Sequence, residues 1–155
     1  DSTRVATYQI SSMNGAKSLG TKFPQLLNLS KSMHSLAHSA GKPGGFRAQG
    51  EWDQFLAKQL ARFIEKLEGT AEGEHGSLLD RTVVFYGSSN SRTHNNRDYP
   101  LILAGGQKLG FSGGDYHEFD SKTPLSNLFV TILNRLDVET PQFADSSGEM
   151  SVVTA

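Results

Sequence analysis

Two short apolar runs constrain the fold of this chain more than any other feature. Residues 82–86 (TVVFY) and 100–104 (PLILA) contain no charged side chain, and each is followed by glycine. Because neither run alternates apolar with polar residues, both are typical of strands buried on both faces, as in a parallel sheet. A third strand is predicted at residues 4–10 (RVATYQI), which are rich in β-forming residues. We therefore expect an α/β fold with a mainly parallel or mixed sheet and flanking helices.

Two amphipathic helices are predicted beside this sheet. Over residues 50–68, apolar side chains recur at steps of three and four. A second helix is expected after Thr123, the predicted N-cap, with Pro124 at the first helical position. The tail from residue 137 is expected to be loop-like, with a short strand at residues 150–153. The apolar positions are Trp52, Phe55, Leu56, Leu60, Phe63, Ile64 and Leu67 in the first helix, and Leu125, Leu128, Phe129, Ile132, Leu133 and Leu136 in the second.

The small number of strands bears on domain organisation. A length of 155 residues is typical of one domain, so residues 1–155 are expected to form a single α/β domain or the C-terminal segment of a larger one. A sheet with so few strands would leave open edges. We expect an upstream segment or another protein chain to complete it. The chain begins with aspartate, which predicts a processed chain, a subunit or a fragment.

Composition excludes several classes of function. Fifteen basic and 16 acidic residues give a net charge of −1 without a basic block, so nucleic acid is not an expected partner. The longest apolar runs are far shorter than the roughly 20 residues that span a bilayer, so no transmembrane segment is expected. The absence of cysteine excludes disulfides, thiolate zinc sites and cysteine nucleophiles.

A histidine pair is the first candidate site. His34 and His38 have the H-x-x-x-H spacing, which places both rings on one face of a helix and can also converge on a metal from a tight loop. The glutamate of the zinc-protease motif is missing, because Ser35 follows His34. The alternative is a polar loop with two solvated histidines.

A polar loop after the first apolar run is the second candidate site. It would lie at the carboxyl end of a strand, where open α/β sheets place their ligands. His94 and Asp98 are suitable ligands that could join the histidine pair on Zn, Mn or Fe. Arg92 and Arg97 could bind an anion bidentately. The alternative is a polar hairpin loop that needs such residues for turns and hydrogen bonds.

The sequence also resembles a known family. Residues 32–39 (SMHSLAHS) resemble the signature of the uncharacterised bacterial HxxSHH family. In this chain Ala37 stands in place of the signature's serine, Ser39 in place of its last histidine, and Met33 in place of a common extra histidine. The resemblance covers essentially the whole chain in the same order, including residues 3–7, 78–88, 98–106, 123–128 and 143–148.

The resemblance implies a location and a distant superfamily. Family members are usually longer and exported, which implies a periplasmic or cell-surface protein. The family is distantly similar to alkaline phosphatases and sulfatases, and this implies a partial alkaline-phosphatase-like layer fold with metal ions at the carboxyl ends of a mainly parallel sheet. His34 and His38 would then match a D-x-x-x-H ligand pair, and His94 or Asp98 would lie near a final ligand. The nucleophile would lie upstream of this chain.

These observations predict a non-catalytic structural or interaction segment, or a subunit, of an exported HxxSHH-like protein, inactive as an isolated chain. One alternative is a metal-dependent hydrolase of phosphate or sulfate esters, in which a divalent metal lowers the pKa of its bound water. The cofactor is then Zn, Mn or Fe, and otherwise there is none. Another alternative is a carbohydrate or cell-surface binding module, suggested by Phe111, Tyr116 and Phe119 in a glycine-rich loop.

Overall fold

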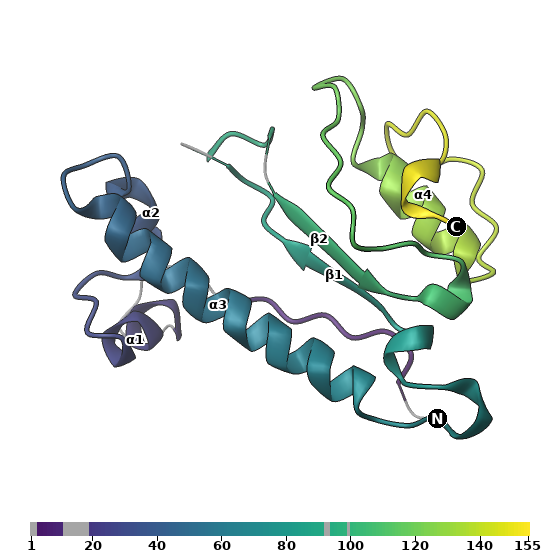
Figure 1. Ribbon diagram of the computed structural model, residues 1–155. Helices are drawn as coiled ribbons and strands as arrows, with labels where there is room; N and C mark the ends of the chain where they lie inside the picture. The colour runs from purple at the N-terminus through teal and green to yellow at the C-terminus, as the bar shows by residue number, and fades with distance from the viewer. Residues whose placement is uncertain (1–2, 11–18, 92–93, 99) are drawn as a thin grey trace. The chain divides into compact units, whose positions relative to one another are not determined.

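The computed structural model describes residues 3–10, 19–91, 94–98 and 100–155, except for the side chains of residues 19–21. The chain forms two compact units, Asp1–Leu60 and Ala61–Ala155. Four helices and two strands follow one another in the described part as α1, α2, α3, β1, β2 and α4, together with several 3-10 turns (Figure 1). None of the described helices combines the length and the apolar character that crossing a bilayer requires.

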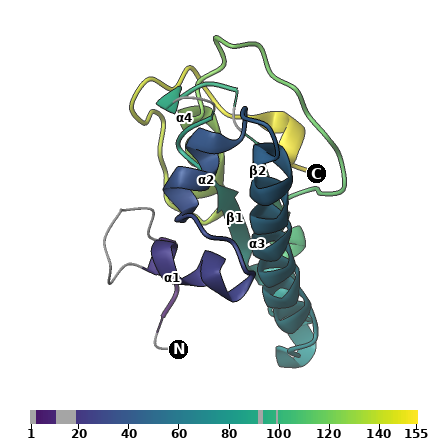
Figure 2. The same cartoon turned by 90° about the vertical axis from the view of Figure 1, so that its left-hand side faces the viewer.

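The first unit is helical and has a small apolar core. Leu29, Leu36 and Trp52 form this core, and the Trp52 side chain is only 1% exposed. The Trp52 and Phe55 rings stack with their centroids 5.6 Å apart. These contacts confirm that the apolar stripe predicted for the long helix is core at these positions. The unit contains α1 (Leu19–Leu26), α2 (Met33–Ser39) and the first part of α3 (Gly45–Glu68), and α1 and α2 lie beside α3 (Figure 2).

The long helix starts earlier than predicted. The periodicity predicted residues 50–68, whereas α3 begins at Gly45. A side chain at position 45 would collide with the backbone carbonyl of Ser39, so glycine permits the close approach with which the helix begins. Farther along α3, the Phe63 side chain is 51% exposed, so the aromatic residues of this helix are not all core.

The predicted strand at residues 4–10 is wrong. These residues form no strand in the described part of the chain, whose sheet has two strands elsewhere. The Val5 and Tyr8 side chains are both 79% exposed. β-forming residue types describe what fits a sheet, but a strand also needs a neighbouring strand to pair with. The segment therefore has the composition of a strand but does not form one in the described structure.

The expected parallel sheet is also wrong, and with it the α/β fold and the alkaline-phosphatase-like layer. The described sheet has two strands, β1 (Val83–Gly87) and β2 (Leu101–Gly105), which pair antiparallel. The two apolar runs are strands as predicted, but the predicted burial on both faces is wrong, because the Phe85 and Ile102 side chains are exposed. An apolar run also does not report strand direction. A parallel pair needs a long crossover, usually a helix. No α-helix is described between residues 88 and 100, so this loop joins the two strands as a hairpin.

One face of the sheet lies against the last helix. α4 (Ser126–Arg135) places the Phe129 ring edge-to-face on Phe85 of β1, with centroids 5.7 Å apart. The Phe143 ring packs edge-to-face on the other side of Phe129, at 6.2 Å. The helix was correctly predicted, but it begins at Ser126, after the predicted N-cap and proline. The Pro124 carbonyl still accepts a hydrogen bond from the Asn127 N–H, at 3.1 Å.

The tail is more ordered than its polar sequence predicted. The strand predicted at residues 150–153 is wrong, because Ser151–Val153 form a 3-10 turn. An isolated antiparallel bridge instead joins Thr154 to Phe111. On either side of it, the Ser112 N–H donates to the Val153 carbonyl at 3.0 Å, and the Ala155 N–H donates to the Gly110 carbonyl at 3.1 Å. The end of the chain is therefore tied to the loop after β2.

Candidate functional site

The histidine pair lies on α2, a helix that its own sequence caps. The Ser32 Oγ accepts a hydrogen bond from the Ser35 N–H at 3.3 Å, as an N-cap does. At the other end, the Ser39 Oγ donates to the Ser35 carbonyl at 2.6 Å and accepts from the Lys31 Nζ at 2.9 Å. The Leu36 side chain fixes the helix to the core. The helical alternative for the H-x-x-x-H motif is thus the one that the structure shows.

The two rings lie next to each other on one face of α2. The His34 and His38 ring centroids are 4.6 Å apart, with an angle of 60° between the ring planes. His34 is half-buried and His38 is exposed. An i,i+4 histidine pair of this kind can offer two imidazole nitrogens to one metal ion.

The pair alone does not make a complete metal centre. Catalytic zinc takes three protein ligands and structural zinc takes four. Within the first unit, the described residues place no third His, Asp or Glu ligand atom within 4.8 Å of both histidines. The residues of this unit therefore fit half of a metal centre, and the four-ligand set with His94 and Asp98 stays a prediction.

The second candidate loop belongs to the second unit and is a hairpin connection. The Ser91 N–H donates to the Asn95 carbonyl at 2.6 Å, which closes a turn. His94 and Asp98 have backbone φ angles of 59° and 52°, in the left-handed region, and both side chains are exposed. The expectation that this loop lies at the carboxyl end of a parallel strand falls with the parallel sheet. Turns favour polar residues such as these, and the roles of His94 and Asp98 as metal ligands stay predictions.

Of the two predicted anion-binding arginines, only Arg97 belongs to the described residues. Arg92 lies outside the described residues, and Arg97 is exposed on the hairpin loop.

The aromatic residues suggested for carbohydrate binding differ in burial. Phe111 is core, at 2% exposed, whereas Tyr116 is 86% exposed and Phe119 is 42% exposed. These three aromatic residues therefore do not form one surface.

The β1–β2 sheet is a candidate interaction surface. Each strand has the other as its neighbour, and the described residues supply no further strand. Neither strand contains a charged residue or a proline. Phe85 and Ile102 lie on opposite faces of the sheet, because Phe85 pairs with Leu103 and Ile102 pairs with Tyr86. Their side chains are 39% and 43% exposed, so both faces present apolar surface.

Sequence reasoning missed a set of polar residues on α4. The Ser126 Oγ donates to the Asp145 carboxylate at 2.6 Å. The Asn127 carboxamide exchanges hydrogen bonds with Ser147, whose N–H donates to Asn127 Oδ1 at 2.8 Å. The Thr131 Oγ1 accepts from the Met150 N–H at 2.7 Å. A sequence signal for these residues was available, because polar side chains recur at steps of four and three, at positions 127, 131 and 134, within an otherwise apolar helix.

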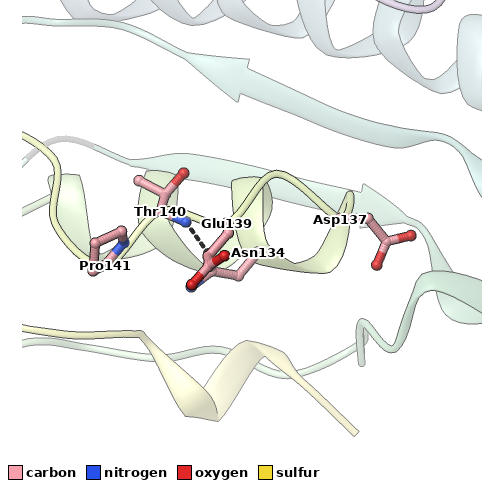
Figure 3. Close-up of a pocket in the computed structure, with 5 residues that line it drawn as sticks. All are labelled: Asn134, Asp137, Glu139, Thr140 and Pro141. Atoms are coloured by element: carbon pink, nitrogen blue, oxygen red, sulfur yellow. Dashed lines mark hydrogen bonds between the residues drawn. The ribbon is translucent and has the colours of Figure 1, made fainter.

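A shallow hollow of about 520 Å³ lies beside this set, and Figure 3 shows the five residues that line it. The Asn134 Oδ1 accepts from the Thr140 N–H at 2.7 Å, and its Nδ2 donates to the Glu149 carboxylate at 2.6 Å. Both polar atoms of the Asn134 carboxamide therefore bond to the tail. The lining residues are Asn134, Asp137, Glu139, Thr140 and Pro141.

Two carboxyl groups away from the candidate ligands have shifted pKa values. Hydrogen bonds from the Ser77 N–H and hydroxyl lower the pKa of Asp80, and the nearby Lys108 adds to this effect. Burial raises the pKa of Asp53, against a hydrogen bond from the Gln49 side chain that lowers it. A shifted pKa marks a functional site only when a suitable cleft accompanies it. The Asp80 shift is explained by its turn.

Comparison of the chain with protein-family models, curated proteins and solved structures finds no match. The resemblance to the HxxSHH family therefore rests on the sequence motifs, and the family, export and activity stay predictions.

Proposed function

We propose that this chain is a structural and interaction segment of an exported protein related to the HxxSHH family, without catalytic activity as an isolated chain. The single observation that carries this proposal is the β1–β2 sheet, whose outer edges have no strand partner among the described residues. The resemblance of the motifs supports the family and, through the family, export. The role that we assign to the segment is to join its sheet to a further strand.

The physical argument concerns the stability and protection of sheet edges. A two-stranded sheet is at best marginally stable by itself, and apolar faces stabilise it only when they are covered. Natural edge strands usually carry Lys, Pro or a bulge that prevents pairing with other strands. β1 and β2 have uncharged, proline-free sequences. They resemble interior strands of a larger sheet more than protected edge strands.

Hydrogen exchange of the isolated chain tests this proposal. In dilute solution, alternate amides of β1 and β2 should point away from the partner strand and exchange rapidly, whereas the amides between the strands are protected. The buried Val130 and Thr131 of α4 serve as internal references for slow exchange. Protection of every amide of both strands in a monomer would contradict the proposal, because the sheet would already be complete.

The histidine pair favours a second candidate function, a metal-dependent hydrolase of phosphate or sulfate esters to which this chain contributes part of the metal centre. Support comes from the adjacent rings of His34 and His38, 4.6 Å apart on one helix face. A bound metal would supply Lewis-acid chemistry and an activated water. The role of this chain's own residues is to hold two imidazoles side by side on a capped helix.

Zinc titration distinguishes the second candidate. The chain is expected to bind zinc, and His34→Ala or His38→Ala should weaken binding at least about tenfold, because each removes a ligand. His75→Ala, at an exposed histidine of the second unit, is the matched control. Equal zinc affinity in all four proteins, measured by calorimetry with elemental analysis, would remove the histidine pair from consideration as a metal site.

A further inference from the structure

Acidic residues are distributed very unevenly along this chain. Residues 2–50 contain six Lys or Arg residues and no Asp or Glu, whereas 15 of the 16 acidic residues lie between residues 51 and 155. The first unit as a whole has seven basic and three acidic residues, and the second unit has eight and 13. Such a charge asymmetry indicates that one part of a chain meets an anionic surface.

We propose that the first unit binds the surface of an anionic phospholipid membrane through the loop between α2 and α3. The contact is made by a group of four side chains, Lys31, Lys42, Phe46 and Arg47, which we call the basic corner. This inference goes beyond the proposed function and does not depend on the sheet.

Ser39, at the end of α2, brings the basic corner together. Its Oγ accepts a hydrogen bond from the Lys31 Nζ at 2.9 Å, and its carbonyl accepts from the Lys42 N–H at 2.9 Å. The Lys42 carbonyl in turn accepts from the Gly45 N–H at 2.8 Å. α3 begins at Gly45, beside α2 (Figure 2), and the next two residues complete the corner. Cationic side chains from three segments thus meet at one end of the first unit.

The basic corner is open to solvent. All four of its side chains are exposed, and the exposed fraction is 76% for Phe46 and 88% for the Arg47 side chain. A Cβ added at Gly41 or Gly44, on either side of Lys42, would meet no atom within 4 Å. The loop backbone is therefore uncovered as well, and a flat surface can approach it.

A phospholipid surface matches this combination of charge and apolar surface. Lys and Arg side chains near an anionic leaflet each strengthen binding, and an exposed aromatic ring can enter the boundary between head groups and acyl chains. Phe46 directly precedes Arg47, so one approach brings both into contact. Arg47 pairs with Glu51 at 3.2 Å, but an exposed pair of this kind is weak. Nucleic-acid surfaces instead use a continuous basic stripe or several stacking rings, and this corner has three cations and one ring.

Vesicle co-sedimentation of the full chain tests the inference. The vesicles are phosphatidylcholine alone, or equal parts of phosphatidylcholine and phosphatidylglycerol. We expect binding to the mixed vesicles only, and release by added salt, which screens the charges. Lys42→Glu should raise the dissociation constant at least about tenfold, because it reverses a charge at the membrane surface. Phe46→Ser should raise it at least about threefold, because it removes the inserted ring.

Matched controls lie in the second unit. Lys122→Glu makes the same change of charge at an exposed lysine, and Tyr116→Ser removes a ring that is 86% exposed. Both variants should bind the mixed vesicles like the wild type. Phe46→Trp adds a direct readout, because the chain's one tryptophan, Trp52, is buried. The fluorescence of the new indole should shift to shorter wavelength on mixed vesicles.

Several outcomes would overturn the inference. They are absence of binding to the mixed vesicles, equal binding to phosphatidylcholine alone, and an unshifted emission of the bound Phe46→Trp variant. Equal weakening by Lys42→Glu and Lys122→Glu would also overturn it, because net charge alone would then explain the binding. So would a single-stranded oligonucleotide that binds more tightly and is weakened by the same variants. None of these outcomes involves the sheet, so hydrogen exchange of β1 and β2 tests the proposed function separately.

Discussion

Hydrogen bonds that fix α2 in the first unit join residues three to eight positions apart. In the second unit, most of the bonds that fix the tail to α4 join residues 15 to 20 positions apart, and the bond from the Thr140 N–H to Asn134 joins residues six apart. In the first unit, the apolar contacts of Leu36 and Trp52 complement this local capping. In the second unit, buried polar side chains such as Asn127 and Thr131 depend on the tail for their partners.

This difference predicts which substitutions destabilise each unit most. A unit with a small apolar core loses most when a core side chain is truncated, because a cavity remains. A helix whose buried polar groups are paired by a distant segment loses most when a partner is removed, because a buried donor or acceptor stays unpaired. Substitutions in the two units should therefore differ in the stability that they cost and in the residues that they expose to hydrogen exchange.

The largest effect is expected from Trp52→Ala. Because this side chain is the centre of the first unit's core, its truncation should lower the free energy of unfolding by about 3–5 kcal/mol. Hydrogen exchange should increase in α2 and remain slow in α4. Phe46→Ala on the same helix is the control, since Phe46 is 76% exposed. Equal losses for the two variants in urea denaturation would argue against this core.

Thr131→Val should have the next largest effect, about 1–3 kcal/mol, because it leaves the Met150 N–H unpaired beside α4. Exchange should increase around Met150 while the first unit is unchanged. Thr70→Val is a matched control, since the Thr70 Oγ1 makes the same bond to the carbonyl four residues earlier but is exposed. If both variants lose the same stability, the distant bond to Met150 contributes nothing.

Ser32→Ala tests the local capping of the histidine helix. Loss of the bond from the Ser35 N–H should cost about 1 kcal/mol and increase exchange in the first turn of α2. The control is Ser30→Ala, at an exposed serine outside the helix. An unchanged stability would mean that packing of Leu36 alone determines this helix.

The smallest effect is expected from Asp80→Asn, on how the free energy of unfolding depends on pH. Because hydrogen bonds from Ser77 lower the pKa of the Asp80 carboxyl in the folded state, the carboxylate stabilises the fold above its ordinary pKa of 3.8. That contribution is lost as the pH falls through the lower, folded-state pKa. Asp80→Asn should therefore reduce the loss of stability below pH 3.8. Identical acid titrations of unfolding for wild type and variant would contradict this.

The predicted site was partly accessible from sequence. The spacing of His34 and His38 predicted neighbouring rings if the segment was helical, and the Ser32 cap makes it helical. The polar tail was predicted to be loop-like. Its bonds from Ser147 and Met150 to α4 were not predicted, because no pattern of neighbouring residues indicates them. The placement of the hairpin-loop residues relied on strand direction, which an apolar run does not report.

The local pattern of this sequence determined the two amphipathic helices α3 and α4, the two apolar strands and the spacing of the histidine pair. These features depend on interactions within one or two helical turns, or on burial of a continuous run. The antiparallel direction of β1 and β2 and the bonds between α4 and the tail arose only in the folded chain. So did the absence of a strand at residues 4–10 in the described part of the chain, because strand formation depends on which distant segments meet.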